Sequence, residues 1–336
     1  MGHPLRWFVP GIVYESTIRT IQERFLLRPS AVSRDIILGI LGRAQTLYPD
    51  VRLHAFIYLS NHSHLMLSGE DGERMAAFIG FVNGNVAREM GRLHGWAGPL
   101  WGRRHRAIPI LDDAATISRL RYLLLQGVKE GLVESPREWP GASAVPALLG
   151  DMIVVGHWYD RTLETRARRR GLTNVSTEFS ERYVVRLTPL PCWRGLTPAN
   201  LAAMHELLVR DIEREAASRS QRAAGATAVC ARDPRERPVA PKTERAPSCH
   251  ASTPRLRATF RAFYRSFVDA FRGAFFYLRS MFGGPAAVTE IASRFPPGSF
   301  PPHLPHVRSS GSSPPWLLAS AHRTGDTCER ERYVSS

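Results

Sequence analysis

The feature that most constrains the fold is the order of apolar patterns in the first half of the chain. Short runs rich in β-branched and aromatic residues, typical of strands, alternate with longer stretches in which apolar residues recur every three or four positions, as in helices. Two of the strand-like runs are separated only by Ser60 and Asn61, which is the spacing of a β-hairpin. The expected elements, in order, are strand 12–19, helix 33–47, strands 51–59 and 62–68, helix 71–93, strand 104–111 and helix 112–126.

This order predicts the fold class. A strand, a helix, two strands, a helix, a strand and a final helix fit an α+β domain, in which helices pack on an antiparallel sheet of the ferredoxin-like type. Of the 336 residues, 43% are hydrophobic, which is enough to build at least one core.

The chain changes character near residue 150, after which Ala, Arg, Pro and Ser gather in runs that bury little. We therefore expect the chemistry within the first domain, and we expect the basic, partly disordered C-terminal extension to be dispensable for it. The predicted segments are a folded domain over 1–150, a basic helical extension over 151–217, a disordered linker over 218–257, an amphipathic aromatic helix over 258–283 and a Pro/Ser-rich disordered tail over 284–336.

The predicted aromatic helix has two interpretations. Its phenylalanines recur at helical spacing with arginines between them, so it could lie on nucleic acid or on a membrane surface. A stripe at this spacing more often packs against protein, and we favour that interpretation. The phenylalanines are Phe260, Phe263, Phe267, Phe271 and Phe275.

The charge indicates a polyanionic partner. The chain has 45 Lys and Arg against 30 Asp and Glu, a net charge of +15, which favours nucleic acid first and an anionic membrane second. No apolar run reaches about 18 residues, and the first residues lack an apolar signal core, so we expect no membrane span and a cytoplasmic location. The four cysteines form no C-x-x-C pair, and we assign them no role.

A His-x-His pair lies on one of the predicted strands. His62 and His64 are two residues apart, so their side chains leave the same face of the strand, with Cα atoms about 6–7 Å apart. Two imidazoles placed in this way can share one metal ion. Such a pair also occurs by chance or for structural reasons, so a second feature has to support it.

The second feature lies on the helix that follows Asp112. Ile117, Leu120 and Leu124 mark its buried stripe, while Tyr122 and Gln126 lie four residues apart on the opposite side. A phenol and a carboxamide oxygen would then project together. Taken separately, the tyrosine also suits packing, and the glutamine a solvated surface.

Four sequence blocks resemble the HUH-type single-tyrosine transposases, which include the REP-associated tyrosine transposases. The block HAFIYLSNHSHLMLS (54–68) resembles their His-x-His segment, and LRYLLLQGVKEGLVESPREWP (120–140) resembles their nucleophile helix with the Gly-Leu-Val and Trp-Pro landmarks. The blocks VPGIVYESTIR (9–19) and PLWGRRHRAI (99–108) are similar as well. The blocks keep the family's order and cover roughly the first 145 residues, whereas the extension has no such counterpart.

The resemblance assigns roles to individual residues. It implies that His62 and His64 bind a divalent metal, Mg²⁺ or Mn²⁺, that Tyr122 is the nucleophile and that Gln126 is a third metal ligand. Two positions depart from the family. Ser63 replaces a hydrophobic residue that faces the core, and Gly127 replaces a frequent proline, but neither change removes a reacting group.

The resemblance also implies an activity and a partner. The family cuts and rejoins single-stranded DNA through a phosphotyrosine, joins the tyrosine to the 5′ phosphate and frees a 3′ hydroxyl. A tyrosine nucleophile conserves the bond energy for rejoining, and a divalent metal polarises the scissile phosphate. We expect single-stranded DNA with hairpin-bearing element ends as the partner, and a monomer or homodimer.

Basic residues near the predicted site suggest phosphate contacts. Arg103, Arg104 and Arg106 adjoin a predicted strand, and Arg88 and Arg92 share one face of the preceding helix. We predict that these five arginines bind DNA, with ordinary solvated charge as the alternative. Trp101 could stack on an unpaired base, although core packing is favoured.

Three other functions compete with the transposase. A domesticated DNA-binding protein would keep the fold without the chemistry, but the intact His62, His64, Tyr122 and Gln126 argue against that loss. A rolling-circle replication initiator or relaxase would usually supply a third histidine, whereas a glutamine four residues after a single tyrosine favours the transposase. A basic membrane-surface protein would leave the first 145 residues or so unexplained.

Overall fold

The computed structural model describes residues 4–171, 176–238, 247–280 and 294–302. These residues fall into two compact units, of which the first contains the described residues up to Phe271 together with Pro296–Phe300. The second unit begins at Arg272, within the last long helix. All residues of the candidate site belong to the first unit.

A four-stranded antiparallel sheet lies at the centre of the first unit. Its strands are β1 (Val13–Arg19), β2 (Arg52–Tyr58), β3 (His62–Ser68) and β4 (Arg106–Ile110), in the order β2-β3-β1-β4. One helix follows β1 and another follows β3, so this order is the ferredoxin-like arrangement, and the predicted fold class is confirmed. The hairpin between β2 and β3 turns at the expected residues, Ser60 and Asn61.

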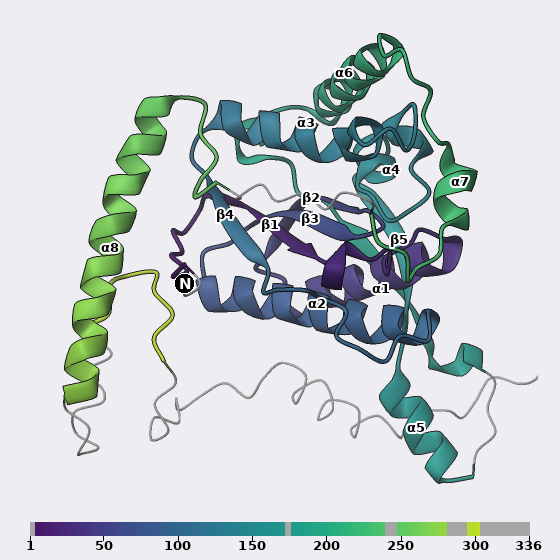
Figure 1. Ribbon diagram of the computed structural model, residues 1–336, viewed down its shortest axis with the longest axis horizontal. Coiled ribbons are helices and arrows are strands. Elements are labelled where there is room, and N and C mark those ends of the chain that lie inside the picture. The colour runs from purple at the N-terminus through teal and green to yellow at the C-terminus, as the bar shows by residue number, and fades with distance from the viewer. Residues whose placement is uncertain (1–3, 172–175, 239–246, 281–293, 303–336) are drawn as a thin grey trace, which may run out of the picture. The chain divides into compact units, whose positions relative to one another are not determined.

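Helices cover both faces of this sheet. Helices α1 (Ala31–Leu47) and α2 (Gly72–Leu93) lie along one face, and α3 (Asp113–Lys129) lies along the other (Figure 1). Each helix begins at a residue whose side chain accepts a backbone hydrogen bond, namely Ser30, Asp71 and Asp112. Side chains alternate between the faces of a strand, so every second residue of β1 and β3 points toward α3.

A glycine near the end of α3 makes room for an indole ring. A Cβ atom on Gly127 would lie 3.1 Å from Cε3 of Trp139, so its absence lets the indole pack directly against the helix. The indole Nε1 of Trp139 then donates a hydrogen bond of 3.1 Å to the carbonyl of Tyr58 in β2. Glycine at this position therefore has a packing reason.

The segment after residue 150 begins with strands rather than with the helices expected over 151–217. Strands β5 (Ile153–Tyr159) and β6 (Ser180–Arg186) form a two-stranded antiparallel sheet that packs on α1. A Cβ on Gly39 would lie 2.0 Å from the carbonyl oxygen of His157, so only glycine permits this close approach. The remaining elements are η1 (Ile21–Glu23), η2 (Pro136–Glu138), α4 (Val145–Leu148), α5 (Arg161–Arg169), η3 (Ser176–Phe179), η4 (Pro191–Trp193), α6 (Pro198–Ala217), α7 (Ala226–Ala231) and α8 (Pro254–Ser280).

Residues after 150 share the core of the first 150 residues. Helix α6 packs on α3 and buries Leu201, Val209 and Ile212 in the same hydrophobic cluster as the sheet. Arg121 of α3 fastens the two helices through ion pairs with Asp211, at 3.2 Å, and Glu215, at 2.8 Å. The extension is therefore packed structure over much of its length.

The linker expected to be disordered over 218–257 contains the short helix α7 and the first turn of α8. Its residues 239–246 lie outside the described part of the chain. Most of the tail expected over 284–336 also lies outside it, and only 294–302 are described.

The aromatic stripe of α8 packs against the N-terminal segment. Trp7 stacks on Phe260 and Phe267 with ring centroids 5.6 and 5.4 Å apart, and the hydroxyl of Tyr264 donates to the carbonyl of Leu5 at 2.7 Å. This contact agrees with the packing interpretation for Phe260 and Phe267, whereas Phe263 is 62% exposed. Within the described ranges, no helix is long and apolar enough to cross a membrane.

Candidate functional site

The two histidines of β3 lie side by side on the face of the sheet that α3 covers. His64 pairs with Thr17 and His62 with Arg19 in the neighbouring strand β1. The two imidazole ring centroids are 5.1 Å apart, and both residues are buried. The strand periodicity therefore brings the two rings together as the sequence predicts.

Each imidazole is oriented by a neighbouring oxygen. Nδ1 of His64 lies 2.7 Å from Oε1 of Glu15, and Nδ1 of His62 lies 2.7 Å from Oδ1 of Asn61. A carboxylate or amide oxygen accepts a hydrogen bond, so each Nδ1 carries the proton and each Nε2 has the lone pair. This is the tautomer that a metal-binding histidine uses when a second group holds its other nitrogen.

Glu15 is a buried carboxylate in the middle of the central strand β1, with an exposed fraction of 2%. Its Oε1 also accepts a hydrogen bond of 2.7 Å from Nη2 of Arg119 on α3. Burial alone would raise the pKa of this carboxyl, but the close contacts with His250 and His64 and the positive charge of Arg119 hold its pKa well below the usual range. Glu15 is therefore an anion that links His64 to Arg119 of the helix.

Tyr122 lies on α3 with its ring facing His64. The two ring centroids are 6.0 Å apart, in an edge-to-face arrangement. Cζ of Arg119 lies 3.8 Å from the centre of the phenol ring, and Nζ of Lys129 lies 4.8 Å from it. Positions three before and seven after Tyr122 share its helix face, so α3 gathers a hydroxyl and two cations beside the histidines.

Gln126 lies one turn after Tyr122 and is buried, with an exposed fraction of 2%. Its Nε2 donates a hydrogen bond of 3.0 Å to the carbonyl oxygen of Tyr122. The solvated-surface interpretation of this residue is therefore wrong. The amide nitrogen is engaged as a donor, so the oxygen is the atom that could coordinate a metal, and that role remains a prediction.

A deep cleft opens in front of Tyr122 and His64. Its volume is about 1240 Å³, and it is lined by seven cationic side chains against two carboxylates, Glu15 and Glu23. His62 lines an adjoining cavity of about 330 Å³, and Arg19 and Glu23 line both. Such a surplus of positive charge suits a phosphodiester chain. The cations are Arg19, Arg103, Arg104, Arg106, Arg119, Lys129 and Arg237.

The arginines predicted to bind DNA divide into two groups. Arg103, Arg104 and Arg106 line the cleft. Arg88 and Arg92 lie on α2, on the other face of the sheet, where they bond to Asn85 and Glu89 of their own helix. The structure thus brings only the first group to the site.

Trp101 packs rather than facing the cleft. The residue is half-buried, and its Nε1 donates a hydrogen bond of 2.9 Å to the carbonyl of Asn83 in α2. The indole therefore fastens the loop before β4 to the helix, in agreement with the packing interpretation.

The side chains around the two histidines determine which ligands a metal ion could have there. Among the residues that the structure describes, no cluster of three or more His, Cys, Asp or Glu side chains has the arrangement of a metal site. A metal between His62 and His64 would therefore need an amide oxygen or water to complete its ligands. Two imidazoles with oriented Nε2 atoms fit this requirement, and Mn²⁺ accepts such nitrogen ligands more readily than Mg²⁺ does.

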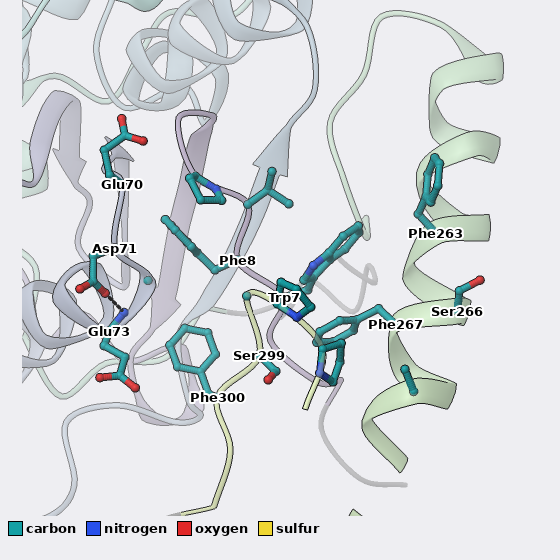
Figure 2. Close-up of a pocket in the computed structure, with 17 residues that line it drawn as sticks. Trp7, Phe8, Glu70, Asp71, Glu73, Phe263, Ser266, Phe267, Ser299 and Phe300 are labelled. Atoms are coloured by element: carbon teal, nitrogen blue, oxygen red, sulfur yellow. Dashed lines mark hydrogen bonds between the residues drawn. The ribbon is translucent and has the colours of Figure 1, made fainter. Parts of the chain in front are cut away.

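A second cavity, of about 820 Å³, has a different character (Figure 2). Aromatic side chains line it, among them Phe8, Phe263 and Phe300, and the acidic start of α2, with Asp71 and Glu73, borders it. An apolar wall with an acidic border repels phosphate, so this cavity does not suit a nucleic-acid backbone.

Four residues of the site escape the sequence analysis. Arg119 and Lys129 could have been found from their helical spacing to Tyr122, and Glu15 from its acidic side chain within an apolar strand. His250 also lines the cleft, with Nε2 2.7 Å from Oε2 of Glu15. No local pattern connects His250 with the site, because it lies far from Glu15 in the chain.

Comparison with known proteins gives similarity in structure only. No protein-family model matches the chain, and no curated protein matches it in sequence. The chain is similar to a structure of a REP-associated tyrosine transposase bound to a REP hairpin, with a TM-score of 0.37 and 16% identity over 43% of this chain and 82% of that one. It is also similar to a crystal structure from Deinococcus radiodurans R1 described as a candidate transposase, with a TM-score of 0.27 and 20% identity over 36% of this chain and 95% of that one. Similarities at such low identities and TM-scores do not establish what this chain does, so its function is inferred from the site itself.

Proposed function

We propose that this chain cuts and rejoins DNA strands as an HUH-type single-tyrosine transposase, with Tyr122 as the nucleophile. The observation that carries the proposal is the position of Tyr122, which lies against His64 and between Arg119 and Lys129 in a strongly cationic cleft. A phenol that only filled the core would need neither a cleft nor two cations at its ring.

The cations suit a charged transition state. Attack by the phenolic oxygen of Tyr122 on phosphorus forms a new P–O bond and breaks the bond to the 3′ oxygen, which leaves with a proton. Negative charge accumulates on the phosphate oxygens during this exchange, and positive side chains fixed in advance stabilise it. Arg119 is fixed by Glu15, and Lys129 extends from the last turn of α3.

The histidines suit a metal-assisted reaction. A divalent metal held by His62, His64 and Gln126 would polarise the scissile phosphate. Glu15 and Asn61 orient the two imidazoles through their Nδ1 atoms, so Nε2 is the atom that would bind the metal. The phosphotyrosine retains the energy of the broken bond, so the reverse attack by a 3′ hydroxyl rejoins a strand without another energy source.

The cleft charge supports DNA as the substrate. The preference for a single strand and for hairpin-bearing ends rests on the four sequence blocks that resemble the family. The strand polarity, with the 5′ phosphate on tyrosine, has the same basis.

The proposal is tested with end-labelled single-stranded DNA that carries a hairpin and a randomised flank, incubated with the full chain and Mn²⁺. A denaturing gel separates cleaved strands and covalent adducts, and a binding assay is run on the same proteins. We expect the wild type to cleave and Tyr122→Phe to bind without cleaving, because only the attacking oxygen is lost. Replacing His62 and His64 together with Ala should also abolish cleavage.

Two outcomes would contradict the proposal. Undiminished cleavage by Tyr122→Phe would exclude Tyr122 as the nucleophile. Binding without cleavage by the wild type itself would favour the domesticated DNA-binding protein.

A further inference from the structure

The strap, defined as residues 247–253, reaches the site from the C-terminal extension. It lies beside the end of β4, where His250 forms a parallel bridge with Ile110. The backbone N–H of His250 donates to the carbonyl of Pro109, and the N–H of Leu111 donates to the carbonyl of His250, both at 2.9 Å. These two bonds fix the register of the strap against the sheet.

The strap is also fastened to the helix that bears Tyr122. The backbone N–H of Ser252 donates to one carboxylate oxygen of Asp112 at 2.8 Å, while the other oxygen caps α3 by accepting from Ala115 at 2.9 Å. Cys249, which precedes His250 in the strap, is buried. One aspartate therefore holds both the strap and the first turn of the nucleophile helix.

This docking places the His250 ring against Glu15. Nε2 of His250 lies 2.7 Å from Oε2 of Glu15, although the two are not aligned as a hydrogen bond. Both atoms are buried, and in the described part of the chain neither has another hydrogen-bond partner. Buried polar atoms are nearly always paired, and a small rotation of either side chain pairs these two with each other.

Glu15 therefore has three neighbours with separate tasks. Its Oε1 orients His64 and accepts a hydrogen bond from Arg119. Of the three neighbours, only His250 lies against its Oε2. Without His250, nothing in the described residues would fix the second oxygen, and the carboxylate would be held through Oε1 alone.

We propose that the strap is part of the catalytic centre and that His250 is a positioning residue, which holds Glu15 so that Glu15 orients His64 for metal binding. This inference rests on the proposed function. It also revises the expectation that the extension is dispensable, because a chain ending near residue 150 would lack His250.

The test uses the full chain and Mn²⁺ as the probe, with the dissociation constant measured by titration calorimetry and adduct formation followed in parallel. Removing a group that orients a metal ligand typically weakens metal binding 10- to 100-fold. His250 acts through Glu15, so we expect about a 10-fold weakening for His250→Phe, at the low end of that range. His250→Gln retains a side-chain N–H for Glu15 and should restore most of the affinity.

The matched control is His157→Phe, since His157 also contacts a carboxylate, Asp35, at 2.9 Å but lies exposed on β5. It should leave Mn²⁺ affinity unchanged. An unchanged Mn²⁺ affinity in His250→Phe would overturn the inference. Equal losses of Mn²⁺ affinity in His250→Phe and His250→Gln, together with lowered stability of both variants, would also overturn it, because they indicate that His250 only packs. If the expected affinities are found but the wild type forms no adduct, the positioning role stands and the proposed function fails.

Discussion

Removing the charge of Glu15 should destabilise the fold as well as the site. The change Glu15→Gln keeps the size of the side chain but removes the carboxylate that pairs with Arg119, whose side chain is 18% exposed. Breaking a fully buried ion pair by neutralising one partner costs about 3–5 kcal/mol. Arg119 retains some contact with water and with the ring of Tyr122, so we expect a loss of about 2–3 kcal/mol in the free energy of unfolding.

The assay is urea denaturation followed by tryptophan fluorescence, with Glu215→Gln as the matched control. Glu215 pairs with Arg121, another arginine of α3, at 2.8 Å, but its side chain is 40% exposed. Water screens such a pair, so the control should lose less than about 1 kcal/mol. Equal stability of Glu15→Gln and the wild type would refute the view that Glu15 is a buried counterion.

Three further predictions concern pH, DNA binding and the metal. Burial lowers the pKa of His54 from 6.5 to about 4. As the pH drops from 6.5 to 4, the unfolded chain therefore binds this proton before the folded chain does, and the free energy of unfolding should fall by about 3 kcal/mol. Comparing pH-dependent unfolding of the wild type with that of His54→Gln isolates this effect, and identical slopes would contradict it. In a salt titration, Arg106→Ala should weaken DNA binding and reduce the slope of log affinity against log salt concentration by close to one unit. Arg92→Ala should leave both the affinity and the slope unchanged. Gln126→Ala should cleave more slowly and recover in part at high Mn²⁺ in a cleavage assay, because water can replace an amide oxygen; full activity at low Mn²⁺ would exclude Gln126 as a ligand.

The fold of the first 150 residues was predictable because its signals are local. Strand periodicity placed His62 and His64 on one face of β3, and the cap at Asp112 set the start of α3 and so the position of Tyr122. These patterns act over a few residues, and the tertiary contacts reinforce them.

The remainder was not predictable because it depends on distant pairs. His250 reaches Glu15 through contacts of the strap with Ile110 and Asp112, which no periodicity encodes. Strands β5 and β6 were missed because most of their residues are not buried, so the alternation of apolar and polar residues is weak. Arg88 and Arg92 were misplaced because charge in sequence does not say which face of the sheet a helix covers.

The role of Tyr122 is tested most directly by identifying the residue that carries DNA. The full chain is incubated with the hairpin-bearing single strand and Mn²⁺, the covalent adduct is isolated under denaturing conditions, and its nuclease-trimmed peptides are sequenced by mass spectrometry. We expect one modified residue, Tyr122, with a nucleotide joined through its 5′ phosphate to the phenolic oxygen. An adduct on any other residue, or cleaved DNA with no adduct at all, would contradict that role.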